Sequence, residues 1–181
     1  MRRQDHASPV AMADPEGLAN AQKGTRKALY TPLERRRRDE SVWTIVQGVL
    51  APLQFLVFVV SLVLVVRALT TGEGAFAADV SIVVKTAILY TIMITGSIWE
   101  KVVFGRWLFA PAFFWEDVFS MAVLALHTLY LSMLFWSLGT VEQRLLVALA
   151  AYGAYAINAA QFLWKLRVAR LEGNNWEQAP A

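Results

Sequence analysis

The chain contains no cysteine, and its only histidines are His6 and His127. Without cysteine it has no disulfide, no thiolate metal ligand and no thiol nucleophile. Two histidines far apart in the sequence also leave little material for a zinc site. Internal repeats, a Walker loop, a glycine-rich nucleotide loop and the GxSxG and HExxH motifs are absent as well. The sequence therefore offers no motif for nucleotide, serine-hydrolase or zinc-hydrolase chemistry.

Charge is scarce along most of the chain, which is 57% hydrophobic. A soluble domain of 181 residues has no core large enough to hide that much apolar surface. Composition therefore predicts an integral membrane protein. The net charge of +3 does not favour nucleic-acid binding, because the basic residues stand beside apolar segments and not on an aromatic-studded soluble domain.

Four apolar segments are long enough to cross a membrane as helices, since about 20 residues at about 1.5 Å each span the hydrocarbon core. We predict an all-α polytopic membrane protein whose four transmembrane helices occupy residues 41–66, 80–104, 112–138 and 141–170. A loop at 70–79 is expected between the first two helices, and a turn at 105–111 between the second and third. Together with a short helix before them, these segments form one domain at 32–171.

Polar residues inside the first two predicted helices need an explanation. Pro52 predicts a kink or a break near the start of the first helix. Gln47 and Gln54 are placed to bond the freed backbone groups or a ligand, and we favour the structural role. Lys85, five residues into the second predicted helix, is expected to extend to the outer interface, where its ammonium group reaches water.

The segments that flank the apolar helices are polar. Residues 1–31 lack periodic apolar residues, which predicts a disordered cytoplasmic extension. The sequence PLERRRRDE at 32–40 predicts a short juxtamembrane helix that sets orientation, with a specific binding site as the alternative. Residues 172–181 are expected to form a short polar tail.

Lys and Arg residues are distributed unevenly between the two ends of the predicted helices. One side carries nine in the N-terminal segment, two in the 101–106 turn and three after Trp164. The other side carries only Arg67, Lys85 and Arg144. Because basic residues concentrate on the cytoplasmic side of membrane proteins, both termini are predicted to be cytoplasmic.

Polar residues recur along one face of the third and fourth predicted helices. At helical spacing these faces carry Glu116, Ser120 and His127 on the third helix, and Asn158, Gln161 and Lys165 on the fourth. Polar groups are costly against lipid, so both faces are expected to point into the bundle. Ser120 is expected to bond its own helix backbone, with the Glu116 carboxyl group as the alternative partner.

Three carboxylates stand near the ends of the second and third helices. Glu100, Glu116 and Asp117 are expected to meet across the turn that joins those helices, near the cytoplasmic face. Charges so close to hydrocarbon are expensive unless they face a protein interior, a cavity or the headgroup layer, which makes them the first candidates for chemistry. The alternative is that they pair with Lys101 and Arg106 at the interface.

The sequence resembles the bacteriochlorophyllide 3-vinyl hydratases, membrane proteins of bacteriochlorophyll biosynthesis. The resemblance covers residues 30–171 and is strongest in the blocks IWEKVVFG and LFAPAFFWEDVFSM. It implies addition of water to the 3-vinyl group of a chlorophyllide or bacteriochlorophyllide, which gives a 3-(1-hydroxyethyl) group. It also implies a bacterial inner or intracytoplasmic membrane as location, and other enzymes of pigment biosynthesis as neighbours.

Residue roles for such a reaction follow from its chemistry. A carboxylic acid withdrawn from water holds its proton more readily, so Glu116 is predicted to be the acid, with Glu100 or Asp117 as the base for water. Addition of water requires no redox cofactor, and the only metal expected is the magnesium of the substrate.

Five further residues are predicted to bind the substrate. His127 is a candidate axial ligand for the substrate magnesium, with a hydrogen-bonded core histidine as the alternative, and Arg106 is placed near the substrate's propionate. The remaining lining residues are Asn158, Gln161 and Trp115. A pigment carrier without catalysis would use the same lining, whereas a proton-coupled transporter is expected to show inverted repeats that this sequence lacks.

Overall fold

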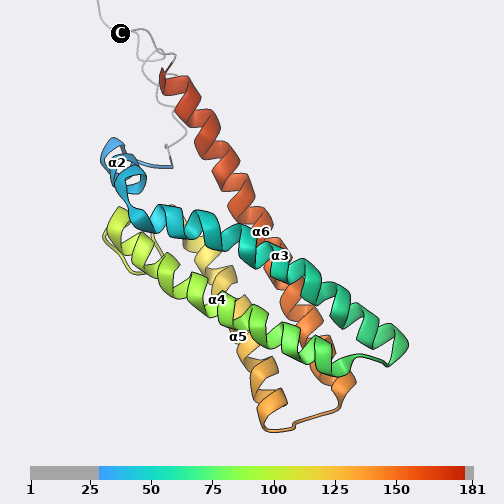
Figure 1. The fold of residues 1–181 in the computed structure, drawn as a ribbon. Coiled ribbons are helices and arrows are strands. Elements are labelled where there is room, and N and C mark those ends of the chain that lie inside the picture. Colours follow the sequence, from blue (N-terminus) through green and yellow to red (C-terminus); the bar gives the residue numbers. More distant parts are fainter. Residues whose placement is uncertain (1–28, 178–181) are drawn as a thin grey trace, which may run out of the picture.

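Five helices make up the described part of the chain, residues 29–177 of a computed structural model, with side chains described to residue 170. In chain order they are α2 (Pro32–Glu40), α3 (Val42–Thr71), α4 (Ala75–Phe104), α5 (Phe114–Phe135) and α6 (Val141–Glu177) (Figure 1). The four long helices are each apolar enough to cross a membrane over Val42–Thr71, Ala75–Phe104, Phe114–Phe135 and Val141–Arg170. The predicted all-α class and the number of long apolar helices are therefore confirmed.

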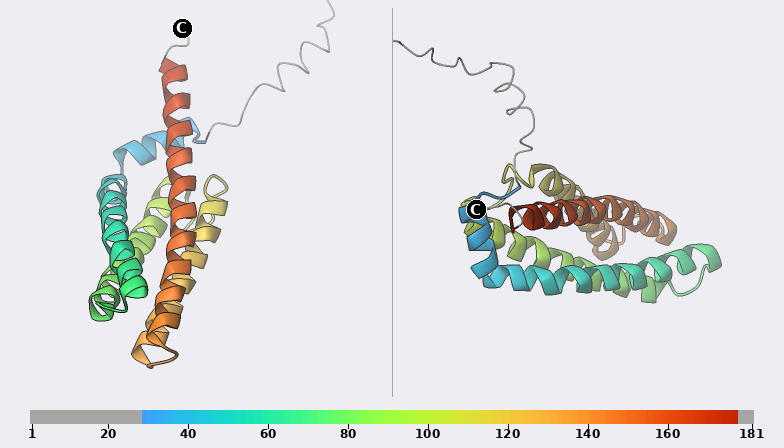
Figure 2. Two further views of the ribbon diagram at one scale, coloured as in Figure 1. Left: turned by 90° about the vertical axis from the view of Figure 1, so that its right-hand side faces the viewer. Right: turned by 90° about the horizontal axis from the view of Figure 1, so that it is seen from above.

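The long helices are arranged as two hairpins. Short connections join α3 to α4 and α5 to α6, and packing is extensive within each pair but sparse between the pairs. The two views of Figure 2 show α3 with α4 on one side and α5 with α6 on the other. We call the surface where the two pairs meet the hairpin interface, and all the candidate functional residues described below face it or border it.

Local signals explain where the first helices begin and end. Thr31 forms a capping box with Glu34 at the start of α2, and the Ser41 side chain accepts a hydrogen bond from the Trp43 N–H at the start of α3. Gly72 and Gly105 close α3 and α4 in the left-handed conformation, which costs glycine nothing. The predicted short helix at 32–40 is confirmed.

Several predicted boundaries were wrong by a few residues. The predicted loop at 70–79 shrinks to residues 72–74, because α3 continues to Thr71 and α4 already starts at Ala75. The third spanning helix is shorter than predicted, at Phe114–Phe135, and the fourth continues into the predicted polar tail, to Glu177. Tyr30 is buried against Phe104 and Phe113, so folded structure begins before residue 32 and the extension predicted at 1–31 is too long at its end. Residues 1–28 of that extension lie outside the described residues.

Of the kink or break predicted at Pro52, the break is not found. Helix α3 runs without interruption through Pro52, whose ring is exposed on the outer surface of the bundle. Gln47 does not repair its own helix either, because its amide donates a 2.8 Å hydrogen bond to Thr95 Oγ1 on α4. Gln54 is 1% exposed and neither amide atom has a partner. The two glutamines therefore differ: Gln47 joins two helices, and Gln54 is buried with its hydrogen-bonding capacity unused.

Candidate functional site

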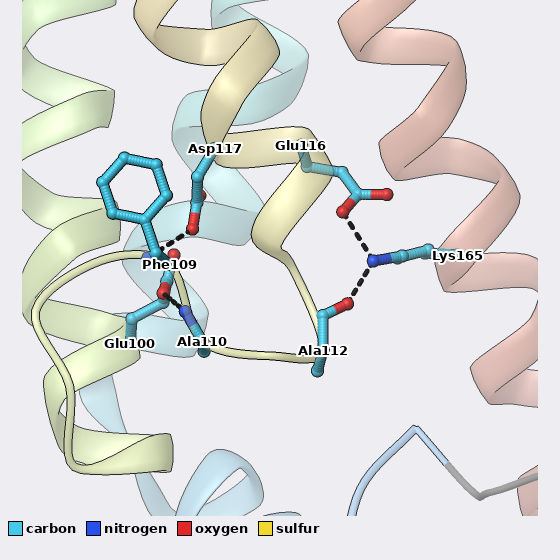
Figure 3. A network of polar contacts seen from close by, with 7 residues as sticks. All are labelled: Glu100, Phe109, Ala110, Ala112, Glu116, Asp117 and Lys165. Carbon is cyan, nitrogen blue, oxygen red and sulfur yellow. Dashed lines mark hydrogen bonds and ion pairs between the residues drawn. The ribbon is translucent and has the colours of Figure 1, made fainter.

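The three predicted carboxylates meet at one end of the bundle, where the linker 105–113 turns from α4 to α5 (Figure 3). The backbone N–H of Phe109 donates to Asp117 Oδ2 at 2.7 Å, and that of Ala110 donates to Glu100 Oε2 at 3.2 Å. Glu100, Glu116 and Asp117 are each no more than 5% exposed. The linker thus holds two carboxyl groups out of water through its own backbone.

The carboxyl groups of Glu100 and Asp117 are neighbours, because the backbone N–H groups of two consecutive residues, Ala110 and Phe109, donate to them. Two carboxylates have acceptors alone, so one of two neighbouring carboxyl groups donates to the other only when it carries a proton. The Glu100–Asp117 pair is therefore a place where a proton can be held between two acids. This arrangement was predicted from the sequence only as a meeting of three carboxylates, without the pairing inside it.

Glu116 has a different partner. Its Oε2 lies 2.5 Å from Lys165 Nζ of α6, and Lys165 also donates to the backbone carbonyl of Ala112. The Glu116 side chain is 6% exposed and that of Lys165 25%, so this is a largely buried ion pair between α5 and α6. Figure 3 shows it beside the carboxyl pair, with Lys165 approaching from the opposite side.

The alternative partners considered for the carboxylates do not pair with them. Lys101 donates to the Gly105 carbonyl at 3.0 Å and lies 5.8 Å from the centre of the Trp107 ring, and Arg106 is exposed. Neither residue forms an ion pair within the described residues. The idea that the cluster serves only to pair with Lys101 and Arg106 is therefore wrong.

Phe109 holds the linker in an unusual backbone conformation. Its φ of 58° lies in the left-handed region, which is unfavourable for a residue with a bulky side chain. This conformation directs the Phe109 N–H to Asp117, one residue before the Ala110 N–H that reaches Glu100. Backbone strain is accordingly located at the residue that positions the carboxyl pair.

A second polar group lies deep in the bundle. Lys85 Nζ is 2.9 Å from His127 Nε2, and His127 Nδ1 is 2.8 Å from the Val123 carbonyl oxygen. Both side chains are 0% exposed, so the prediction that Lys85 extends to the outer interface was wrong. Both ring nitrogens of His127 are occupied, which agrees with a hydrogen-bonded core histidine and leaves no nitrogen free to ligate a magnesium ion in this state.

Polar side chains of α5 and α6 lie between the two groups along the helices. Asn158 Nδ2 donates to Ser120 Oγ at 2.8 Å, a partner that the sequence did not suggest. Neither the expected bond of Ser120 to its own helix backbone nor the alternative bond to Glu116 is found among the described residues. The oxygen atoms Asn158 Oδ1 and Gln161 Oε1 are buried without a partner. Glu116, His127 and Asn158 are buried and the Gln161 oxygen is enclosed, which fits the prediction that these polar faces point into the bundle.

Two predicted binding residues lie apart from this interior. Trp115 is 66% exposed and packs edge to face on Phe114, and Arg106 lies exposed in the linker. They border the carboxyl cluster from outside.

Sequence reasoning missed Lys85 as part of the interior because the predicted helix began at residue 80. The helix starts at Ala75, which places Lys85 one and a half turns deeper.

Comparison with known proteins identifies relatives of the whole folded region. Residues 30–168 match the family model described as 2-vinyl bacteriochlorophyllide hydratase. A protein of that name from Rhodobacter capsulatus is 65% identical over 154 residues, which cover 83% of this chain and 88% of the relative. Another from Cereibacter sphaeroides is 63% identical over 149 residues, 81% of this chain and 91% of the relative. No solved structure matches the chain.

Proposed function

Because the chain belongs to the 2-vinyl bacteriochlorophyllide hydratase family, we propose that it adds water to the vinyl group of a bacteriochlorophyllide-type tetrapyrrole. The product carries a 1-hydroxyethyl group in place of the vinyl group. The vinyl position is numbered 2 in the family name and 3 in the systematic tetrapyrrole numbering, and both denote the same substituent. The match over residues 30–168, which includes every residue of the interior site, is the observation that carries this proposal.

The Glu100–Asp117 pair is suited to start this reaction. Hydration of a vinyl group begins with a proton on its terminal carbon, after which the cation on the adjacent carbon is shared with the conjugated macrocycle. A group that can hold a transferable proton away from bulk water fits this step, and the two buried, neighbouring carboxyl groups form one. We assign the proton donor to this pair on that ground.

Glu116, the acid favoured by sequence, is engaged in an ion pair with Lys165, so we give it a role other than proton donor. A carboxylate held in this way accepts hydrogen bonds, and it is placed to orient the incoming water. The water oxygen bonds to the cationic carbon, and the proton that it releases returns to the carboxyl pair. The site is then ready for another substrate, with one water consumed and no electron transferred.

The reaction as written requires no cofactor besides the magnesium that the substrate carries. The protein supplies a proton, an oriented water and an apolar surface for the macrocycle. Asn158, Gln161 and Trp115 remain proposed contacts of the substrate. Other enzymes of pigment biosynthesis are proposed neighbours that supply and consume the pigment.

The orientation proposed for the protein places the carboxyl cluster at the cytoplasmic end of the bundle. The basic helix α2 and the tail after Trp164 lie on the side predicted to be cytoplasmic by charge. The membrane proposed is the bacterial inner or intracytoplasmic membrane, in which the four long helices are embedded.

Labelled water tests the proposed reaction. Purified protein is incubated with a vinyl bacteriochlorophyllide in water labelled with heavy oxygen and deuterium, without nucleotide, flavin or dioxygen. The expected product has heavy oxygen in its hydroxyethyl group and deuterium in the adjacent methyl. Unchanged vinyl pigment that stays bound to the protein identifies a carrier instead. Label that enters only when dioxygen is supplied identifies an oxygenase, and either result rejects the hydratase assignment.

A further inference from the structure

Lys85 is enclosed at the centre of the bundle, where its ammonium group meets all the other spanning helices. It lies ten residues into α4, about 15 Å from the start of the helix. Nζ contacts His127 of α5 at 2.9 Å. It also lies 4.3 Å from the ring centre of Tyr155 on α6 and 5.8 Å from that of Phe58 on α3. This single side chain therefore occupies the middle of the hairpin interface.

The surroundings of Lys85 supply no negative charge. Aromatic rings stabilise a cation through their faces, and His127 accepts a hydrogen bond, but no carboxylate among residues 29–170 pairs with Lys85. A buried ammonium without a counter-charge is costly, and an ionisable group inside a membrane protein is by default a candidate for function. These surroundings favour an anionic ligand for Lys85.

Gln54 gives an independent sign of a ligand at the same level. It lies one turn before Phe58 on α3, is 1% exposed, and has both amide atoms without a partner. Buried amides are normally hydrogen-bonded, since leaving them unpaired costs free energy. An unused donor and acceptor, one helical turn from the Phe58 ring that faces Lys85, are features of a site whose polar ligand comes from outside the chain.

We propose that Lys85 binds the propionate carboxylate of the tetrapyrrole substrate, with the Gln54 amide donating a second hydrogen bond and the macrocycle lying in the hairpin interface. This inference rests on the proposed function. Buried side chains of all four long helices fill the hairpin interface, but fewer residues approach closely between the hairpins than within them, so the two hairpins would part there to admit a flat ligand. The vinyl and propionate groups stand on different rings of the macrocycle. On α5, Asp117 of the carboxyl pair and His127, the neighbour of Lys85, are ten residues apart, about 15 Å along the helix, and the proposal requires one substrate to span this distance.

This assignment replaces Arg106 as the residue that recognises the substrate acid, and the two are distinguished by substrate modification. The purified full-length protein is assayed with the vinyl bacteriochlorophyllide as free acid and as propionate methyl ester. The wild type and the variants Lys85→Met and Arg106→Met are compared. Methionine keeps a long apolar side chain at both positions, so Arg106→Met is the matched control for the loss of a charge elsewhere.

The expected result is a difference in KM, not in kcat. The wild type is expected to have a KM about tenfold or more higher for the ester, because the ester cannot accept a charge-assisted hydrogen bond as a carboxylate does. Lys85→Met is expected to raise the KM for the free acid to that of the ester, and Arg106→Met is expected to keep the difference.

Two outcomes overturn the anion site. Equal KM values for acid and ester in the wild type reject the anion site. This comparison needs no variant, so it remains decisive even when Lys85→Met does not fold. A Lys85→Met protein that keeps the full preference for the acid rejects it too. A wild type that hydrates neither compound instead rejects the proposed function, and the anion site with it.

Discussion

At the scale of single residues, variants of the carboxyl groups test whether the Glu100–Asp117 pair is the proton donor. In Glu100→Gln or Asp117→Asn the pair loses one of the two acids proposed to hold the proton, and we expect kcat to fall about 10²- to 10⁴-fold, the usual contribution of a general acid. Both amides are close in shape to the acids, so binding of the pigment should persist. Single-turnover hydration and pigment binding, measured on the same preparation, check the two expectations.

A charge-balanced double variant is the control for this assignment. Glu116→Gln alone leaves the Lys165 ammonium group unpaired, so its effect would mix stability with catalysis. The double variant Glu116→Gln with Lys165→Met removes both charges, and it is expected to keep hydration within about tenfold of wild type. A loss as large as that of Glu100→Gln would return the role of proton donor to Glu116, as the sequence alone suggested.

At this scale the sequence predicted which polar residues are buried more accurately than it predicted their hydrogen-bond and ion-pair partners. Glu116, His127 and Asn158 were predicted to point inward from helical spacing alone, since burial follows from the cost of polar groups in lipid. Which side chains pair depends on how each helix is rotated about its axis relative to its neighbours. The spacing of residues along one helix carries no information about that rotation. Lys165 as the partner of Glu116, and Ser120 as the partner of Asn158, therefore emerged only from the fold.

At the scale of elements, the linker 105–113 acts as a rigid holder for the carboxyl pair. Phe109→Gly keeps the N–H that reaches Asp117 and relieves the left-handed backbone, so hydration is expected to stay within about threefold of wild type. Phe109→Pro removes the donor and cannot adopt a positive φ. Since a hydrogen bond to a charged group contributes about 1.5–3 kcal/mol, we expect a loss of about tenfold or more. Steady-state kinetics of both variants decides the question, and equal activities would show that the linker does not position the pair.

The ends of elements were predictable where a local signal marks them. The Thr31–Glu34 capping box and the arginine run define α2, and Gly105 marks the end of α4. The start of α4 could not be predicted in this way. The apolar residues after Gly74 are as compatible with a glycine-containing loop as with the first turn of a helix. That error of five residues is what placed Lys85 wrongly at the surface.

At the scale of the whole molecule, four spanning helices followed from hydropathy and length, whereas the grouping into two hairpins with sparse contact between them did not. Length and hydropathy specify which segments leave water, and short connections specify which neighbours are antiparallel. How tightly the two pairs then pack depends on side-chain fit across the hairpin interface. This is also where the buried polar residues gather, so the part of the fold that sequence specifies least is the part that carries the proposed site.

Orientation in the membrane is the last whole-molecule prediction. With Lys85 inside the bundle, only Arg67 and Arg144 remain on the side predicted to be outer, and Arg144 lies 3.4 Å from Asp79. The charge bias is thus stronger than the sequence count suggested, and it favours a cytoplasmic carboxyl cluster. A reporter that is active only in the periplasm should be inactive when fused after Leu171 and active when inserted between Gly72 and Gly74. The reverse pattern would put Glu100 and Asp117 on the periplasmic side and the proton for hydration would come from there.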